Sequence, residues 1–152
     1  MKKSSMDTGI LQSLIRLKTW ELEVSIVDGN RANQTLSNTE KEFKDTSDNV
    51  HNLENEIRTS YKKFDTLSLS NMQIQNQYLN LQRELLKLKE DEKHCAENVV
   101  VQIYNQIKQQ KQKLQMYEKL HEKYINSIKY GELIRNMHEL DELCMQGRNN
   151  NS

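Results

Sequence analysis

The sequence contains no proline, four glycines and two cysteines among its 152 residues. Proline is the strongest helix breaker, so its absence leaves long helices without an internal stop. The cysteines, at positions 95 and 144, match neither a disulfide framework nor the ligand spacing of a zinc site. Only 35% of the residues are apolar, which is too few for the core of an ordinary compact domain. These shortages exclude a disulfide-stapled fold and favour helices with most faces in water.

Motifs that carry enzyme chemistry are also missing. The chain has no glycine-rich phosphate loop and no HExxH, GxSxG or CxxC sequence. We therefore predict a protein that is not an enzyme and that uses no cofactor and no metal. No apolar run of signal-peptide or membrane-spanning length follows the basic start, which predicts a nuclear or cytoplasmic protein, not secreted and without a transmembrane segment.

The sequence is rich in one apolar stripe that repeats in steps of three and four residues. With Leu36 as position a, Phe43, Val50 and Ile57 follow at seven-residue intervals, and Leu53 opens the run of leucines at d. A 3.5-residue repeat sustained over many heptads is typical of a left-handed coiled coil. The predicted fold class is therefore all-α, an elongated coiled coil. The predicted coiled-coil interface comprises Leu36, Phe43, Val50, Leu53, Ile57, Phe64, Leu67, Asn71, Ile74, Tyr78, Leu81, Leu85, Leu88, Val99, Ile103, Ile107, Leu114, Tyr117, Tyr124 and Ile128.

The glycines lie near changes in this pattern and set the predicted boundaries. Asp28-Gly29-Asn30 combines a stop, a residue that tolerates left-handed geometry and a possible N-cap, so we expect a break between two helices there. Near residues 92–100 the apolar stripe moves by one position, which predicts a slip of the heptad frame. The predicted organisation is a flexible N-terminus (1–9), a short apolar helix (10–27), a long heptad helix (31–130), a short amphipathic helix (132–146) and a flexible tail (147–152).

The segment 10–27 is apolar on more than one face, so it needs a partner on two sides. We predict that it folds back or docks on another subunit, through the residues Leu14, Leu17, Trp20 and Leu22. Docking of this segment on a lipid surface, as in a membrane-trafficking tether, is an alternative. The acidic residues Glu21, Glu23 and Asp28 offset its positive charge, which disfavours a membrane partner.

The residues of the stripe bear on the choice of partner. Val50 and Ile57 at a, with Leu53 at d, favour two parallel strands. The aromatic residue Phe43 at a would overfill the core of a homodimer, and Glu92 at a would meet a second carboxylate. The expected partner is another coiled-coil protein, the chain itself, or both, and the pattern supports a heteromer at least as well as a homodimer.

Lysines gather in one part of an otherwise balanced chain, which has 22 basic and 22 acidic residues. A basic helix can follow the phosphates of a nucleic acid, which makes a nucleic-acid-associated coil a second alternative. A solvated outer face is the ordinary explanation of such a run, and we favour it. The possible basic face consists of Lys108, Lys111, Lys113, Lys119 and Lys123.

These patterns predict a structural or scaffold subunit of a coiled-coil assembly, in the cytoskeleton, the spindle or kinetochore, or meiotic chromosomes. The apolar N-terminal segment with Ser13-Leu14, Arg16 and Leu17, followed by a tyrosine- and glutamine-rich coil around Tyr104, Tyr117 and Tyr124, resembles central-element proteins of the synaptonemal complex. No motif specific to that family accompanies these residues. The resemblance implies self-assembly and a partner in chromosome pairing.

Overall fold

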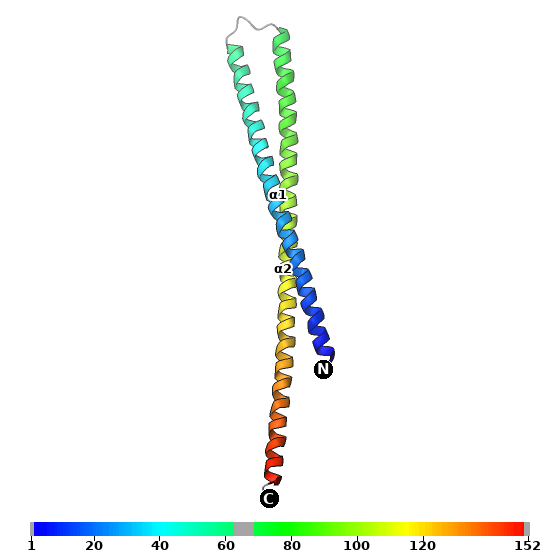
Figure 1. The fold of residues 1–152 in the computed structure, drawn as a ribbon. Helices are drawn as coiled ribbons and strands as arrows, with labels where there is room; N and C mark the ends of the chain where they lie inside the picture. The colour runs from blue at the N-terminus through cyan, green and yellow to red at the C-terminus, as the bar shows by residue number, and fades with distance from the viewer. Residues whose placement is uncertain (1, 63–68, 151–152) are drawn as a thin grey trace. The chain divides into compact units, whose positions relative to one another are not determined.

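The computed structural model describes two helices, α1 (Lys2–Lys62) and α2 (Leu69–Asn150), shown in Figure 1. Residues 1, 63–68 and 151–152 lie outside the described part, and these include the predicted interface residues Phe64 and Leu67. The described residues form no strand. The prediction of an all-α protein is confirmed, with two long helices packed together.

The chain divides into two compact units. The hairpin unit spans Ser25–Gln106, and the terminal unit joins Met1–Val24 to Ile107–Ser152. In the hairpin unit α1 and α2 lie side by side and antiparallel, because residues later in α1 contact residues earlier in α2. The amide of Asn33 donates to the hydroxyl of Tyr104 at 2.7 Å, and Glu54 pairs with Arg83 at 3.0 Å. The partner helix of α1 is therefore part of the same chain, where the sequence favoured parallel strands.

Val50, Ile57 and Leu79 form the buried core of the hairpin unit, with Leu53 and Leu86 packed against them. Among the described residues no large side chain is fully buried, since a layer of only two helices leaves each contact open along its edges.

Most residues of the hairpin unit that are shielded from solvent recur in steps of three and four along each helix, and we call the longest such row on each helix, from Ala32 to Ile57 and from Met72 to Ile103, the inner stripe. On α1 the inner stripe coincides with the predicted a and d positions from residue 36 to residue 57. On α2 each inner position from residue 72 to residue 100 lies one residue after a position of the predicted heptad frame, whereas Ile103 coincides with a predicted interface residue. The inner stripe consists of Ala32, Leu36, Thr39, Phe43, Thr46, Val50, Leu53 and Ile57 on α1, and Met72, Gln75, Leu79, Gln82, Leu86, Lys89, Lys93, Ala96, Val100 and Ile103 on α2.

The predicted frame slip near residues 92–100 is wrong. Shielded positions keep a single register along α2, through Val100, Ile103 and Ile107 and on to Tyr117. The change of register lies instead between α1 and α2. The sequence pattern was interpreted as that of one continuous helix. α2 instead carries two rows at heptad spacing, and the row that the prediction followed up to Val99 does not face α1.

Three predicted boundaries are also corrected. α1 continues through Asp28-Gly29-Asn30 without a break, and Gly29 is buried. One glycine inside a helix costs about 1 kcal/mol, which the packing of a long helix can offset. The predicted helix 31–130 is not a single helix, since α1 ends at Lys62 and α2 begins at Leu69. The predicted separate helix 132–146 is part of α2.

The predicted flexible ends are helical wherever the structure describes them, over residues 2–9 and 147–150. In the terminal unit Leu11 and Ile107 are buried, and Leu114, Tyr117 and Ile128 are half-buried. Residues 132–149 are exposed throughout.

Candidate helix-docking surface

Six of the exposed apolar side chains of α2 in the hairpin unit form one row, and we call them the outer stripe. Successive members are three or four residues apart, except for the eleven residues between Leu88 and Val99, where Glu92 and Cys95 occupy the intervening positions. All six therefore share one face of the helix. Each directly precedes a residue of the inner stripe and therefore lies about 100° around the helix from it. The outer stripe consists of Ile74, Tyr78, Leu81, Leu85, Leu88 and Val99, whose exposed fractions range from 38% to 63%.

A groove between the two helices lies beside the outer stripe. Its α1 wall includes Asn49, Asn52 and Glu56, and its α2 wall includes Tyr78 and Gln82. The ring of Tyr78 thus belongs both to the outer stripe and to the groove. A helix placed on the outer stripe would therefore also contact α1.

Lys89 connects the two helices on this side of the hairpin unit. Its ammonium lies 3.0 Å from a carboxylate oxygen of Glu42 on α1 and 3.3 Å from one of Glu92 on α2. The hydrogen bond to Glu42, and then the one to Glu92, raise the pKa of Lys89 above its ordinary value. Lys89 is therefore charged at neutral pH, and Glu92, the residue predicted at an a position, is exposed and paired with it.

The opposite side of the hairpin unit is closed by polar contacts between the helices. Arg83 donates from Nε and Nη2 to the same oxygen of Glu54, at 3.3 and 3.0 Å. The amide of Asn76 donates to the hydroxyl of Tyr61 at 3.5 Å. This side offers no apolar row comparable to the outer stripe, so the outer stripe marks the side on which a further helix would pack.

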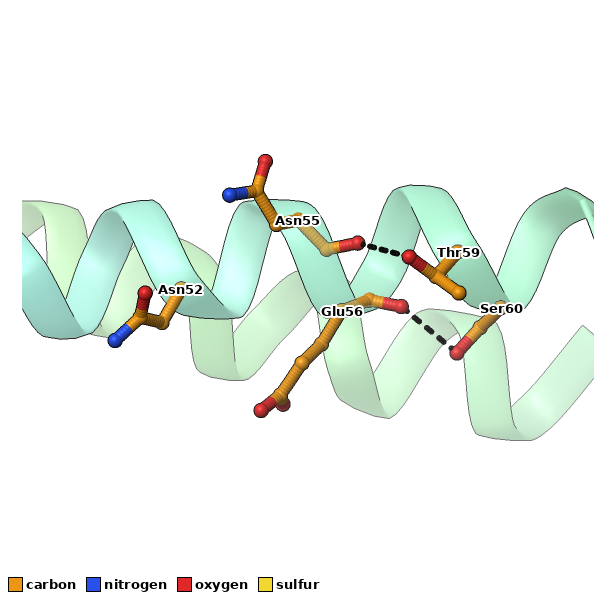
Figure 2. Close-up of a pocket in the computed structure, with 5 residues that line it drawn as sticks. All are labelled: Asn52, Asn55, Glu56, Thr59 and Ser60. Atoms are coloured by element: carbon orange, nitrogen blue, oxygen red, sulfur yellow. Dashed lines mark hydrogen bonds between the residues drawn. The ribbon is translucent and has the colours of Figure 1, made fainter.

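A polar pocket on α1 carries little chemistry. Figure 2 shows Asn52, Asn55, Glu56, Thr59 and Ser60 along one face of the helix. The hydroxyls of Thr59 and Ser60 donate to the backbone carbonyls of Asn55 and Glu56, at 2.8 and 2.9 Å. Both hydroxyls thus donate their hydrogen bonds within the preceding helical turn. Neither of these bonds is to a base that could activate the hydroxyl as a nucleophile.

The predicted N-terminal docking residues divide between two faces of α1 in the terminal unit. Leu17 and Trp20 are exposed, at 49% and 60%, whereas Leu14 and Leu22 are half-buried. This division agrees with the expectation of a segment that is apolar on more than one face. Docking of the exposed pair on another subunit stays a prediction.

The predicted basic residues are all exposed: Lys108, Lys111, Lys113, Lys119 and Lys123. Exposure suits a solvated face as well as a nucleic-acid surface, so the second alternative stays a prediction. Both cysteines are exposed and free. In the described part of the chain, no group of three or more histidine, cysteine or acidic side chains could hold a metal ion, and no helix there is long and apolar enough to cross a bilayer.

Sequence reasoning missed the polar members of the inner stripe on α2. Gln75, Gln82 and Lys89 have no apolar signal, and the stronger outer stripe next to them was interpreted as the seam instead. The buried side-chain oxygen of Gln75 has no hydrogen-bond partner. Extending the register of Val100 and Ile103 back along the sequence could have identified the inner stripe, since both residues belong to it.

Comparison with known proteins adds no assignment, because no family model, curated protein or solved structure matches this chain.

Proposed function

We propose that this protein is a structural or scaffold subunit, without enzymatic activity, that acts through coiled-coil association of its helices. The observation that carries the proposal is the outer stripe of the hairpin unit. The inner stripe already packs α1 against α2, so the outer stripe, a second row at heptad spacing, does not contribute to packing within the hairpin unit. Apolar patches that stay exposed in this way commonly mark interaction sites.

The remaining features agree with a subunit that binds other helices. The predicted N-terminal docking segment exposes Trp20 and Leu17 in the terminal unit. The helical end of α2 likewise exposes Leu133, Met137 and Leu140. We place the partner helix on the outer stripe because that row is the longest of these and lies beside a groove. The cellular process, including the resemblance to central-element proteins of the synaptonemal complex, gains no support from the comparisons and is not part of the proposal.

A double substitution on the outer stripe tests this function. We expect Leu81→Asp with Leu88→Asp to weaken binding of a synthetic amphipathic helix with a leucine seam and uncharged borders by at least about tenfold, since two carboxylates would be desolvated in the contact. Binding is measured by fluorescence anisotropy of the labelled peptide, and the helix content of the variant by circular dichroism.

The matched control is Gln34→Asp with Asn55→Asp, which adds the same charge at two exposed positions of α1, each two residues from the nearest members of the inner stripe and therefore on the side of α1 turned away from α2. The control should bind the peptide as the natural chain does. If neither the natural chain nor the control binds the peptide, or if the outer-stripe variant binds equally well, the outer stripe is not a docking surface and the proposed function fails.

A further inference from the structure

Carboxylates of α1 lie on the same side of the hairpin unit as the outer stripe. This inference rests on the proposed function and concerns the chemistry of the partner. Lys89 holds Glu42 of α1 and Glu92 of α2 on the same side of the hairpin unit, at 3.0 and 3.3 Å. The groove itself joins Glu56 of α1 to Tyr78 of the outer stripe. Two separate contacts therefore place acidic residues of α1 next to the exposed apolar row.

The other border of the outer stripe carries more acidic than basic charge. Glu84, Lys87 and Asp91 lie along this border, and all three are exposed. Glu84 and Asp91 are seven residues apart, so the two carboxylates lie in one line along the helix, on the side of the outer stripe that is turned away from α1.

The charges in and around the groove do not cancel. The cations on this side are Lys87, which is exposed, and Lys89, whose ammonium is already bound by two carboxylates. They are outnumbered by the five carboxylates that surround the outer stripe, those of Glu42, Glu56, Glu84, Asp91 and Glu92. A helix that entered this groove with acidic borders would face like charges on both sides, whereas basic borders would be attracted.

We infer that the occupant of the outer stripe is a helix from another protein with an apolar seam and lysine or arginine along both borders. The row from Ile74 to Val99 is about 38 Å long at ~1.5 Å per residue, so the partner helix needs about seven turns. It also places a basic or small polar residue opposite Glu92, because an apolar seam would desolvate the Glu92–Lys89 ion pair.

A second copy of this chain suits the groove poorly. Parallel pairing of two outer stripes sets Glu92 against Glu92 of the second copy. In either direction a second copy brings the same borders, on which five carboxylates outnumber the ammoniums of Lys87 and Lys89. The lysine-rich part of the chain exposes a short apolar row, Met116, Leu120 and Tyr124, which cannot cover a row that extends over seven turns.

The test compares two labelled synthetic helices of about 28 residues that share one leucine seam and differ only in having lysine or glutamate at the border positions. With the full chain at low salt, we expect the lysine-bordered helix to bind at least about tenfold more tightly than the glutamate-bordered helix. Higher salt should reduce this preference, because exposed ion pairs are screened.

Charge reversal at the borders identifies the residues responsible. The variant with Glu56→Lys, Glu84→Lys and Asp91→Lys should prefer the glutamate-bordered helix. The matched control with Glu40→Lys, Asp48→Lys and Glu90→Lys changes three exposed carboxylates that lie away from the groove, and it should keep the natural preference.

Equal binding of the two helices would overturn this inference and leave the proposed function standing. So would a discrete dimer of the chain, seen by light scattering, that the outer-stripe substitutions Leu81→Asp and Leu88→Asp dissociate. Failure of both bordered helices and of the uncharged helix to bind would instead overturn the proposed function.

Discussion

Replacing Leu79 by alanine lowers the free energy of unfolding by about 2–4 kcal/mol, whereas the same change at Leu81 alters it by less than about 0.5 kcal/mol. Leu79 is 6% exposed and packs with Val50 and Ile57, so its truncation opens a cavity between the helices. Leu81 is 60% exposed and contributes little to the hairpin unit. Both values are obtained from urea unfolding followed by circular dichroism at low protein concentration.

The two leucines are a matched pair, since the same substitution is made two residues apart on one helix and only the burial of the side chain differs. The heptad frame taken from Leu36 predicts the reverse order, with Leu81 at a d position of the seam. A larger loss for Leu81→Ala than for Leu79→Ala would show that the outer stripe, and not the inner one, joins the helices.

Placing proline at residue 30 should lower the free energy of unfolding by about 3 kcal/mol or more and reduce the helix content. Asn30 lies inside the uninterrupted α1, where the proline ring removes a backbone hydrogen bond and clashes with the preceding turn. The measurement is thermal unfolding followed at 222 nm, together with the helical signal at low temperature.

Asn30→Ala is the control for the loss of the asparagine side chain, and it should be neutral or slightly stabilising, because alanine is the best helix former. If a second helix began near Asn30, proline would fall in its first turn and be tolerated. Equal stability of the proline and alanine variants would therefore restore the predicted break at Asp28-Gly29-Asn30.

The sequence was sufficient to predict helices and the face that α1 buries. Its lack of proline and its regular row through Leu36, Val50 and Ile57 indicate one amphipathic helix, and those residues do face α2. The same reasoning placed a boundary at Gly29, although one glycine is too weak a signal to end a helix supported on both sides.

The reversal of the chain and the true seam of α2 were not predictable in the same way. An apolar row shows that a helix needs a partner, but it does not say whether that partner belongs to the same chain. On α2 the row through Leu81 and Leu88 is more apolar than the row through Gln82 and Lys89, so composition favours the wrong face. Lys89 is stabilised at the inner stripe by its ion pair with Glu42 across the interface, a contact that no local pattern contains.

The return of α2 along α1 is the central claim, because it divides the apolar residues into an inner stripe that is used and an outer stripe that is free. Its most direct test is the distance between spin labels at Glu54→Cys and Arg83→Cys, with Cys95 and Cys144 replaced by serine and the labelled chain diluted in unlabelled chain. These residues are 29 positions apart in the sequence and form an ion pair at 3.0 Å. The antiparallel hairpin unit predicts a single distance below about 20 Å, from an interhelical spacing of about 10 Å plus the label arms. One continuous helix would hold the labels about 44 Å apart at ~1.5 Å per residue, and that distance would contradict the account.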